Sequence, residues 1–197
     1  MCILERVRLF CDLLPGKVCC YTMSNKVHTE NWPKEKPDLY RLLYQQLAAM
    51  MEGETHPLPN LANASALLWQ AMEQINWVGF YLNTGHEELL LGPFQGKTAC
   101  IRIPFSRGVC GAAARQERTQ LVYDVHQFPG HIACDSASNS EIVVPLMQNG
   151  RLVGVLDIDS PHVGRFDEED KAGLEAIAAL LSQHCDWDGW RLSSDIQ

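Results

Sequence analysis

The sequence predicts an α+β domain in which helices pack on one mostly antiparallel sheet. Two features of the chain support this fold class. The spacing of apolar residues changes from a helical period to strand-like alternation, and returns to a helical period near the C-terminus. Turn signals containing glycine, threonine and asparagine separate the apolar segments closely enough for antiparallel hairpins.

The composition is that of an ordinary globular protein. The 197 residues are 46% hydrophobic, and no apolar run approaches the roughly 20 residues that a membrane-spanning helix needs. No membrane association is therefore expected. The 16 basic and 24 acidic residues give a formal charge of −8, which disfavours contact with a phosphate backbone. No nucleic-acid partner is expected either.

Residues 1–34 are expected to form an N-terminal extension outside the core. Four of the eight cysteines precede Met23, and charged residues interrupt the apolar positions of this region, so no secretory signal is recognised. Free cysteines suit a reducing compartment, and a cytoplasmic location is expected. Residues 35–187 are expected to form the domain and residues 188–197 a C-terminal tail, whereas the role of residues 1–22 stays open.

Two helices are expected at the start of the domain, and the first of them is amphipathic. The first covers residues 39–53, where leucines recur at a helical spacing after Pro37 and the pattern ends at Gly53. The second is expected over about residues 61–73. Both would pack on the sheet.

Three strands are expected next, at residues 75–83, 88–94 and 99–105. Thr-Gly and Gln-Gly turn signals separate them, as in a meander. A short helix over residues 107–117 and a strand over residues 120–125 follow.

A loop with neither a helical nor a strand period spans residues 125–141. A structureless segment of this length is uncommon in a compact domain and is usually functional or disordered. A hairpin over residues 141–160 then turns at Asn149 and Gly150, a strong turn signal between apolar strands. The chain closes with a helix that Asp167 can cap.

Cys100, Cys110 and Cys134 lie near this loop and are candidate redox thiols. A single cysteine is more often a small buried hydrophobe, which is how we interpret Cys185. Cys100 falls in an expected strand, Cys110 opens the short helix, where free N–H groups favour a thiolate, and Cys134 lies in a polar loop. The gaps between them, with His131 close to Cys134, do not match a structural zinc site, so no metal is expected.

Acidic residues and aromatic residues each share a face of an expected strand. Asp157 and Asp159 are two residues apart, so both point to the same side, and Glu141 begins the partner strand of that hairpin. A polar, solvent-facing sheet surface would explain these acids, but their place beside the long loop favours a site that holds an ammonium group. Trp77 and Tyr81 share a face by the same rule, with core packing as the alternative.

Four segments of the chain together resemble one family: NWVGFYL, LGPFQGKTACIRIPFSRGVCGAAA, DVHQFPGHIACDSASNSEIVVPL and GRLVGVLDIDSP. They are similar to the free methionine-(R)-sulfoxide reductases, which are built on a GAF domain. The resemblance covers about residues 35–185 and implies a GAF-like single catalytic domain. It implies reduction of free L-methionine (R)-S-oxide to L-methionine, and the preference for the R epimer depends on the family alone.

The resemblance also implies roles for the three thiols. Cys134 corresponds to the nucleophile, which becomes a sulfenic acid, and Cys100 to the thiol that resolves it as an intramolecular disulfide. Cys110 corresponds to a thiol that is also able to form a disulfide. Whether Cys100 or Cys110 resolves first stays open.

The remaining site residues implied by the resemblance form the substrate pocket. Trp77 and Tyr81 would surround the methyl-sulfur end of the substrate, and Glu141, Asp157 and Asp159 its polar end. Because closely spaced acids resist full ionisation, Asp157 or Asp159 is expected to stay protonated and donate to the sulfoxide oxygen.

No bound cofactor is expected. The resemblance implies that thioredoxin reduces the disulfide, with NADPH acting through thioredoxin reductase. The oligomeric state is left open, with a homodimer as one option. Fold alone does not separate this enzyme from a non-enzymatic GAF sensor of small ligands or from a thiol redox switch.

Overall fold

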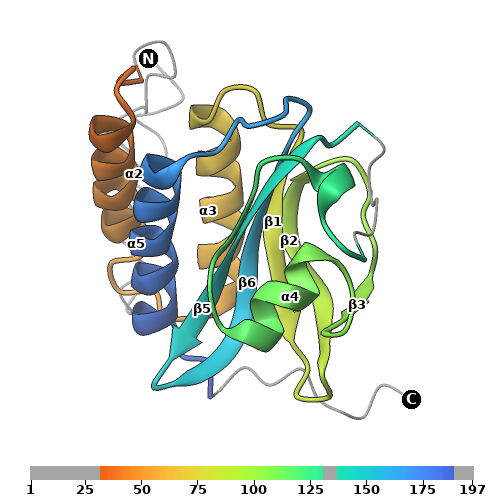
Figure 1. The fold of residues 1–197 in the computed structure, drawn as a ribbon. Coiled ribbons are helices and arrows are strands. Elements are labelled where there is room, and N and C mark those ends of the chain that lie inside the picture. Colours follow the sequence, from red (N-terminus) through yellow and green to blue (C-terminus); the bar gives the residue numbers. More distant parts are fainter. Residues whose placement is uncertain (1–31, 131–136, 189–197) are drawn as a thin grey trace, which may run out of the picture. The chain divides into compact units, whose positions relative to one another are not determined.

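The computed structural model describes residues 32–130 and 137–188 (Figure 1). The expected N-terminal extension and C-terminal tail lie almost wholly outside these ranges. Among the described residues, none of the helices combines the length and apolar character that crossing a membrane requires. The helices and strands follow in the expected order: α2 (Lys36–Met50), α3 (Pro57–Ala71), β1 (Trp77–Asn83), β2 (Glu88–Gly96), β3 (Arg102–Pro104), α4 (Gly108–Gln116), β4 (Gln120–Val122), the 3₁₀ turn η1 (Val125–Gln127), β5 (Ser140–Gln148), β6 (Arg151–Ser160) and α5 (Glu168–His184).

The strands form one six-stranded sheet in the order β3-β2-β1-β6-β5-β4. Every pairing is antiparallel, which confirms the expected α+β class and its antiparallel sheet. The long central strands come from two hairpins, β1-β2 and β5-β6, joined by the pairing of β1 with β6.

Helices cover both faces of the sheet (Figure 1). Helices α2, α3 and α5 lie on one face, where α3 packs on β1 and β2 and α5 packs on β5. Helix α4 lies on the opposite face, over β5 and β6. The strands therefore separate two hydrophobic clusters, and alternate residues of each central strand belong to different clusters.

The first two helices begin earlier than the apolar pattern indicates. Helix α2 starts at Lys36 and α3 starts at Pro57, and each has a proline in its first two positions. Proline suits the first turn because its fixed φ is helical and its missing N–H would be unpaired there. In α3 the ring Nδ1 of His56 also accepts a hydrogen bond from the N–H of Leu58, at 3.2 Å.

Strand β3 is much shorter than the expected strand over residues 99–105. Its ladder with β2 ends where Leu90 faces Arg102, and one further hydrogen bond joins the N–H of Leu91 to the carbonyl of Ile101. Pro93 has no N–H, so β2 has no donor with which to continue this ladder. The prediction that Cys100 lies in a strand is therefore wrong, because it belongs to the segment that connects β2 and β3.

The expected strand over residues 120–125 also stops early. Strand β4 ends at Val122, and η1 begins where the Asp124 side chain accepts a hydrogen bond from the N–H of His126, at 3.0 Å. This cap starts the turn because it provides a local partner for a backbone donor.

A buried carboxylate joins α2 to α5. Asp170, in the first turn of α5, accepts hydrogen bonds from Lys36 Nζ at 2.6 Å and from the Tyr40 hydroxyl at 2.7 Å. Arg165 lies 3.3 Å from the same carboxylate. The capping role predicted for Asp167 is confirmed, since its side chain accepts from the N–H groups of Glu169 and Asp170.

Candidate active site

A pocket lies on the α4 side of the sheet, where β1, β5 and β6 run beside one another. All five residues predicted to form the substrate pocket line it, together with the first turn of α4. The lining residues are Trp77, Tyr81, Lys97, Thr98, Ala99, Ile103, Gly108, Val109, Cys110, Ser138, Glu141, Asp157 and Asp159.

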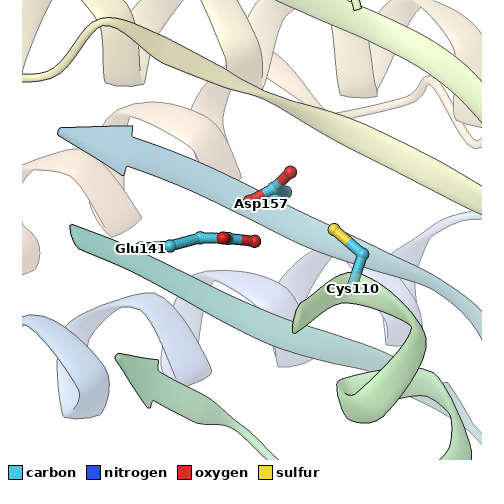
Figure 2. Close-up of side chains that lie close together, drawn as sticks. All are labelled: Cys110, Glu141 and Asp157. Carbon is cyan, nitrogen blue, oxygen red and sulfur yellow. The ribbon is translucent and has the colours of Figure 1, made fainter. Parts of the chain in front are cut away.

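Three buried polar side chains converge at the inner end of this pocket (Figure 2). Cys110 comes from the first turn of α4, Glu141 from the start of β5 and Asp157 from β6. One ligand atom from each lies within 4.8 Å of the others, and the residues are only 4%, 6% and 6% exposed. Two carboxylates and a thiol therefore share one desolvated space.

Asp159 follows Asp157 by two residues in β6, so its side chain lies on the same face of the sheet. The ladders place it directly opposite Trp77 of β1 on one side and Glu141 of β5 on the other. It is more exposed than Asp157, which lies deeper along the same strand. The prediction that Asp157 and Asp159 share a face is confirmed, because both line the pocket while Leu156 and Ile158 belong to the opposite cluster.

The aromatic wall of the pocket is a stack of three rings. Trp77 stacks on Tyr81, with ring centroids 5.8 Å apart, and on Phe94 of β2, at 5.4 Å. The stack crosses Gly79, where a Cβ atom would lie 2.3 Å from Phe94 Cβ and 2.6 Å from Trp77 Cη2. Only glycine therefore allows the indole ring to lie flat across β1 at this point.

Hydrogen bonds fix the polar ends of two of these rings. The Trp77 Nε1–H donates to the carbonyl of Lys97 at 3.1 Å, and the Tyr81 hydroxyl donates to the carbonyl of Cys100 at 3.0 Å. Both acceptors lie in the segment between β2 and β3. The aromatic wall and the backbone around Cys100 are thus held together.

The three predicted thiols have different positions. Cys110 belongs to the buried cluster, whereas Cys100 is half-buried and packs at the edge of the same hydrophobic cluster without lining the pocket. Cys134 lies outside the described residues, as does His131. The described chain resumes at residue 137, and the next residue, Ser138, lines the pocket.

Burial disfavours ionisation of both inner carboxyls. It raises the pKa of Asp157 to about 6, although hydrogen bonds with Cys110 and Glu141 act in the opposite direction. It also raises the pKa of Glu141 well above its usual range, and the negative charges of Asp157 and Asp159 raise it further. The two carboxyls therefore retain a proton more readily than solvated acids do.

The same environment disfavours the thiolate of Cys110. Burial raises its pKa well above the ordinary value, and the charges of Asp157 and Glu141 add to that effect. The prediction that its position near the helix N-terminus favours a thiolate is wrong for Cys110, because desolvation and two acids outweigh the partial charge of a short helix.

One oxygen of the acidic cluster is unsatisfied. Asp157 Oδ1 is buried and has no hydrogen-bond partner within residues 32–130 and 137–188. A buried oxygen without a partner is unusual and favours a ligand that donates to it or coordinates it.

Sequence reasoning missed three polar residues of the pocket lining, Ser138, Lys97 and Thr98. Ser138 is 4% exposed, and its hydroxyl accepts a hydrogen bond from the Asn76 side chain at 3.0 Å. Lys97, the basic residue of the lining, follows the irregular end of β2. The Ser/Asn-rich composition before β5 was the available signal for Ser138, whereas no pattern marks Lys97.

Comparisons with known proteins agree with this geometry. The GAF domain family matches residues 62–185. The free methionine-R-sulfoxide reductase of Escherichia coli (strain K12) is 53% identical over 75% of this chain and 89% of its own length, and that of Saccharomyces cerevisiae (strain ATCC 204508 / S288c) is 45% identical over 76% and 87%. The X-ray structure of free methionine-R-sulfoxide reductase from Neisseria meningitidis in complex with its substrate superposes with a TM-score of 0.73, at 49% identity over 76% of this chain and 90% of that one. The chain therefore belongs to the GAF domain family and, within it, to the free methionine-R-sulfoxide reductases.

Proposed function

We propose that this protein reduces free L-methionine (R)-S-oxide to L-methionine with cysteine thiols as the reductant. The observation that carries the proposal is the pocket in which a buried pair of acids, Glu141 and Asp157, faces a stacked aromatic wall. The relatives named above include a reductase solved with its substrate, which favours the same class of substrate here.

The two ends of the pocket suit the two ends of the substrate. The rings of Trp77 and Tyr81 offer apolar surface to the methyl group and the thioether chain. The ammonium group is held at Asp159, whose charge also acts on Glu141. A charge-assisted hydrogen bond of this kind contributes about 1.5–3 kcal/mol, and a methionine within a chain has no ammonium group to make it.

The acid pair supplies the proton for the chemical step. A proton retained between Glu141 and Asp157 is donated to the sulfoxide oxygen, which makes the sulfur more electrophilic. The thiolate of Cys134 attacks that sulfur and forms a sulfur–sulfur bond as the sulfur–oxygen bond breaks and the protonated oxygen leaves as hydroxide. Hydroxide then adds to the Cys134 sulfur and breaks the sulfur–sulfur bond, which releases methionine. The net step consumes the thiolate, the sulfoxide and one proton, and forms methionine and a sulfenic acid on Cys134.

A second thiol then resolves the sulfenic acid. Attack by Cys100 on the sulfenic sulfur forms a disulfide and releases water. Cys100 suits this role better than Cys110, because Cys110 is buried and its raised pKa disfavours the nucleophilic thiolate. Thioredoxin, recycled by its reductase and NADPH, reduces the disulfide by thiol exchange. We therefore expect the enzyme to work in a reducing compartment, the cytoplasm.

Turnover with purified components tests the proposal. The full-length protein is mixed with thioredoxin, thioredoxin reductase and NADPH, and NADPH oxidation is followed after addition of free methionine R-sulfoxide. We expect turnover with the free amino acid and little with its N-acetylated form, because acetylation removes the ammonium charge. Equal rates for the two substrates would contradict the proposed contact with the ammonium group. No turnover with either substrate would contradict the proposed reductase activity.

Matched cysteine variants separate the roles of the thiols. Cys134→Ser is expected to abolish turnover. Cys100→Ser is expected to complete one reduction but to cycle slowly with thioredoxin. Cys185→Ser is the control, since this buried thiol lies at the end of α5, where Asn60 donates to its sulfur. Full multiple turnover by Cys134→Ser would refute the assignment of the nucleophile.

A further inference from the structure

We propose that Cys110, Glu141 and Asp157 form a binding site for a divalent transition-metal ion of the Zn²⁺ class, which occupies the pocket in place of the substrate. Metal binding by these three residues does not depend on the proposed reductase activity. The claim that the metal competes with methionine sulfoxide does rest on the proposed function. The ion acts as an inhibitor and takes no part in the proposed chemistry.

The positions of the three side chains suit one ion. Figure 2 shows the Cys110 sulfur directed toward Asp157, with the Glu141 carboxylate extending into the same gap from β5. Zinc lies about 2.3 Å from sulfur and about 2.1 Å from oxygen, so tetrahedral ligand atoms are about 3.6 Å apart. All three present separations are within 4.8 Å, so no pair has to close by more than about 1.2 Å, which rotation of the flexible Glu141 side chain can provide.

An independent observation points to a ligand at this position. Asp157 Oδ1 is buried and lacks a hydrogen-bond partner in the part of the chain that the structure describes. The residue as a whole is 6% exposed, so water reaches it poorly. Coordination to a cation would satisfy this oxygen and offset the cost of burying the carboxylate.

The charges of the pocket lining also favour a cation. Glu141, Asp157 and Asp159 are acidic, and within the described lining Lys97 is the one basic residue. A divalent ion at the inner end would offset the charge of the two buried carboxylates there. The retained proton serves the same purpose when no metal is bound.

The donor set selects zinc-like ions over magnesium and calcium. Hard cations take six or more oxygen ligands, whereas this cluster offers two carboxylates and a sulfur. Zinc accepts sulfur and carboxylate oxygen together in a four-coordinate site. Three protein ligands leave one position open toward the pocket, where a water molecule can bind.

The first experiment measures metal binding without substrate. Reduced full-length protein competes with a chromophoric chelator for Zn²⁺, and Co²⁺ serves as a spectroscopic probe through its thiolate charge-transfer band. We expect Cys110→Ser to weaken Zn²⁺ binding at this site by at least about tenfold and to remove its share of the cobalt–thiolate band. Cys185→Ser is the matched control and should bind like the unsubstituted protein. Other cysteines of the chain contribute equally to both variants.

Asp157→Asn provides a second variant in case Cys110→Ser fails to fold, as checked by circular dichroism. It retains the thiol and nearly the same volume, and should also weaken Zn²⁺ binding by at least about tenfold. If both folded variants bind Zn²⁺ as tightly as Cys185→Ser does, the metal site is refuted.

Substrate competition separates this inference from the proposed function. We expect saturating free methionine sulfoxide to raise the apparent Zn²⁺ dissociation constant of the Cys110-dependent site. Turnover without Cys110-dependent metal binding would refute the metal site and leave the reductase intact. Cys110-dependent metal binding in a protein without turnover would refute the reductase and leave the metal site intact.

Discussion

Glu141 lies directly across the β5–β6 ladder from Asp159, yet its carboxylate extends along the strands to Asp157, whose own ladder partner is Val143. Glu141 and Asp157 are therefore diagonal neighbours on one face of the sheet, because Asp157 is two residues before the residue opposite Glu141. A long side chain such as that of Glu141 can reach a diagonal neighbour. This relationship brings the carboxyls of Asp157 and Glu141 close enough to share the proton proposed above, with Asp159 as the more exposed third acid.

The raised pKa of Asp157 predicts that stability depends on pH at this residue. Its pKa is about 6 in the folded protein against 3.8 for the ordinary side chain, so the folded state binds the proton more tightly. The resulting stabilisation is complete below about pH 3.8 and is lost as the pH rises through about 6, an effect of about 3 kcal/mol at most. Relative to Asp157→Asn, the unsubstituted protein should therefore lose stability between pH 4 and pH 7, measured by urea unfolding with a metal chelator present.

Asp124→Asn provides a control of opposite sign. The pKa of Asp124 is lowered by hydrogen bonds from the Gln127 side chain and the His126 N–H. Its stabilisation is present above its ordinary pKa and is lost as the pH falls. A parallel pH dependence for the unsubstituted protein and Asp157→Asn would show that the pKa of Asp157 is not raised by folding.

Gly79→Ala should disrupt the aromatic wall. A Cβ at this position would lie 2.3 Å from Phe94 Cβ and 2.9 Å from Phe94 Cα, so the stack of Trp77 on Phe94 must separate. We expect a loss of stability of about 1–3 kcal/mol and a KM raised at least about tenfold, with changed near-UV circular dichroism. Gly53→Ala is the control, because its Cβ would meet open space and only its positive φ of 79° is strained. An unchanged KM for Gly79→Ala would argue against the stack as a substrate wall.

Tyr81→Phe should affect the resolving step more than substrate binding. The substitution keeps the ring that stacks on Trp77 and removes the hydroxyl that donates to the Cys100 carbonyl. We expect a stability loss of about 1 kcal/mol and slower disulfide formation in a single turnover, with KM within about twofold. Tyr44→Phe, on the exposed surface of α2, is the control. A raised KM with normal disulfide formation would assign the hydroxyl to substrate binding instead.

Asp170→Asn should strongly destabilise the fold without affecting the chemistry. The carboxylate side chain is 1% exposed and pairs with Lys36 and Arg165, so its neutralisation leaves two cations without their shared partner. Breaking a buried pair in this way costs about 3–5 kcal/mol. Asp188→Asn breaks an exposed pair with Arg151 and should cost about 1 kcal/mol or less. Urea midpoints at constant m-value measure both, and equal midpoints for the two variants would contradict this account.

Periodicity predicted the fold and the residues that share each face. The helices of the outer layer, the Asn149–Gly150 hairpin and the common face of Asp157 and Asp159 all follow from local patterns, which folding preserves. The starts of α2 and α3 were less predictable. Each helix begins with a first turn that contains proline and precedes the periodic apolar residues, so the apolar pattern alone places the start too late.

Non-local features of the site could not be predicted from local patterns. The pairing of Glu141 with Asp157 depends on strand register and side-chain direction, and the stack of Trp77 on Phe94 depends on a bulge in β2. The position of Cys100 outside a strand depends on where the β2–β3 ladder ends. The raised pKa of Cys110 depends on burial by elements from three parts of the chain.

Because side chains of the central strands alternate between the two faces of the sheet, one face stabilises the fold and the other forms the pocket. Side chains such as Val78, Phe80 and Ile158 pack with the helical layer, while their immediate neighbours in sequence face the pocket. In a saturation mutagenesis scan along β1 or β6, the effects should therefore alternate from one residue to the next. Substitutions of residues that face the helices should lower protein abundance, and substitutions of residues that face the pocket should lower turnover. New substrate preferences can thus evolve on one set of positions while the other set preserves the folded state.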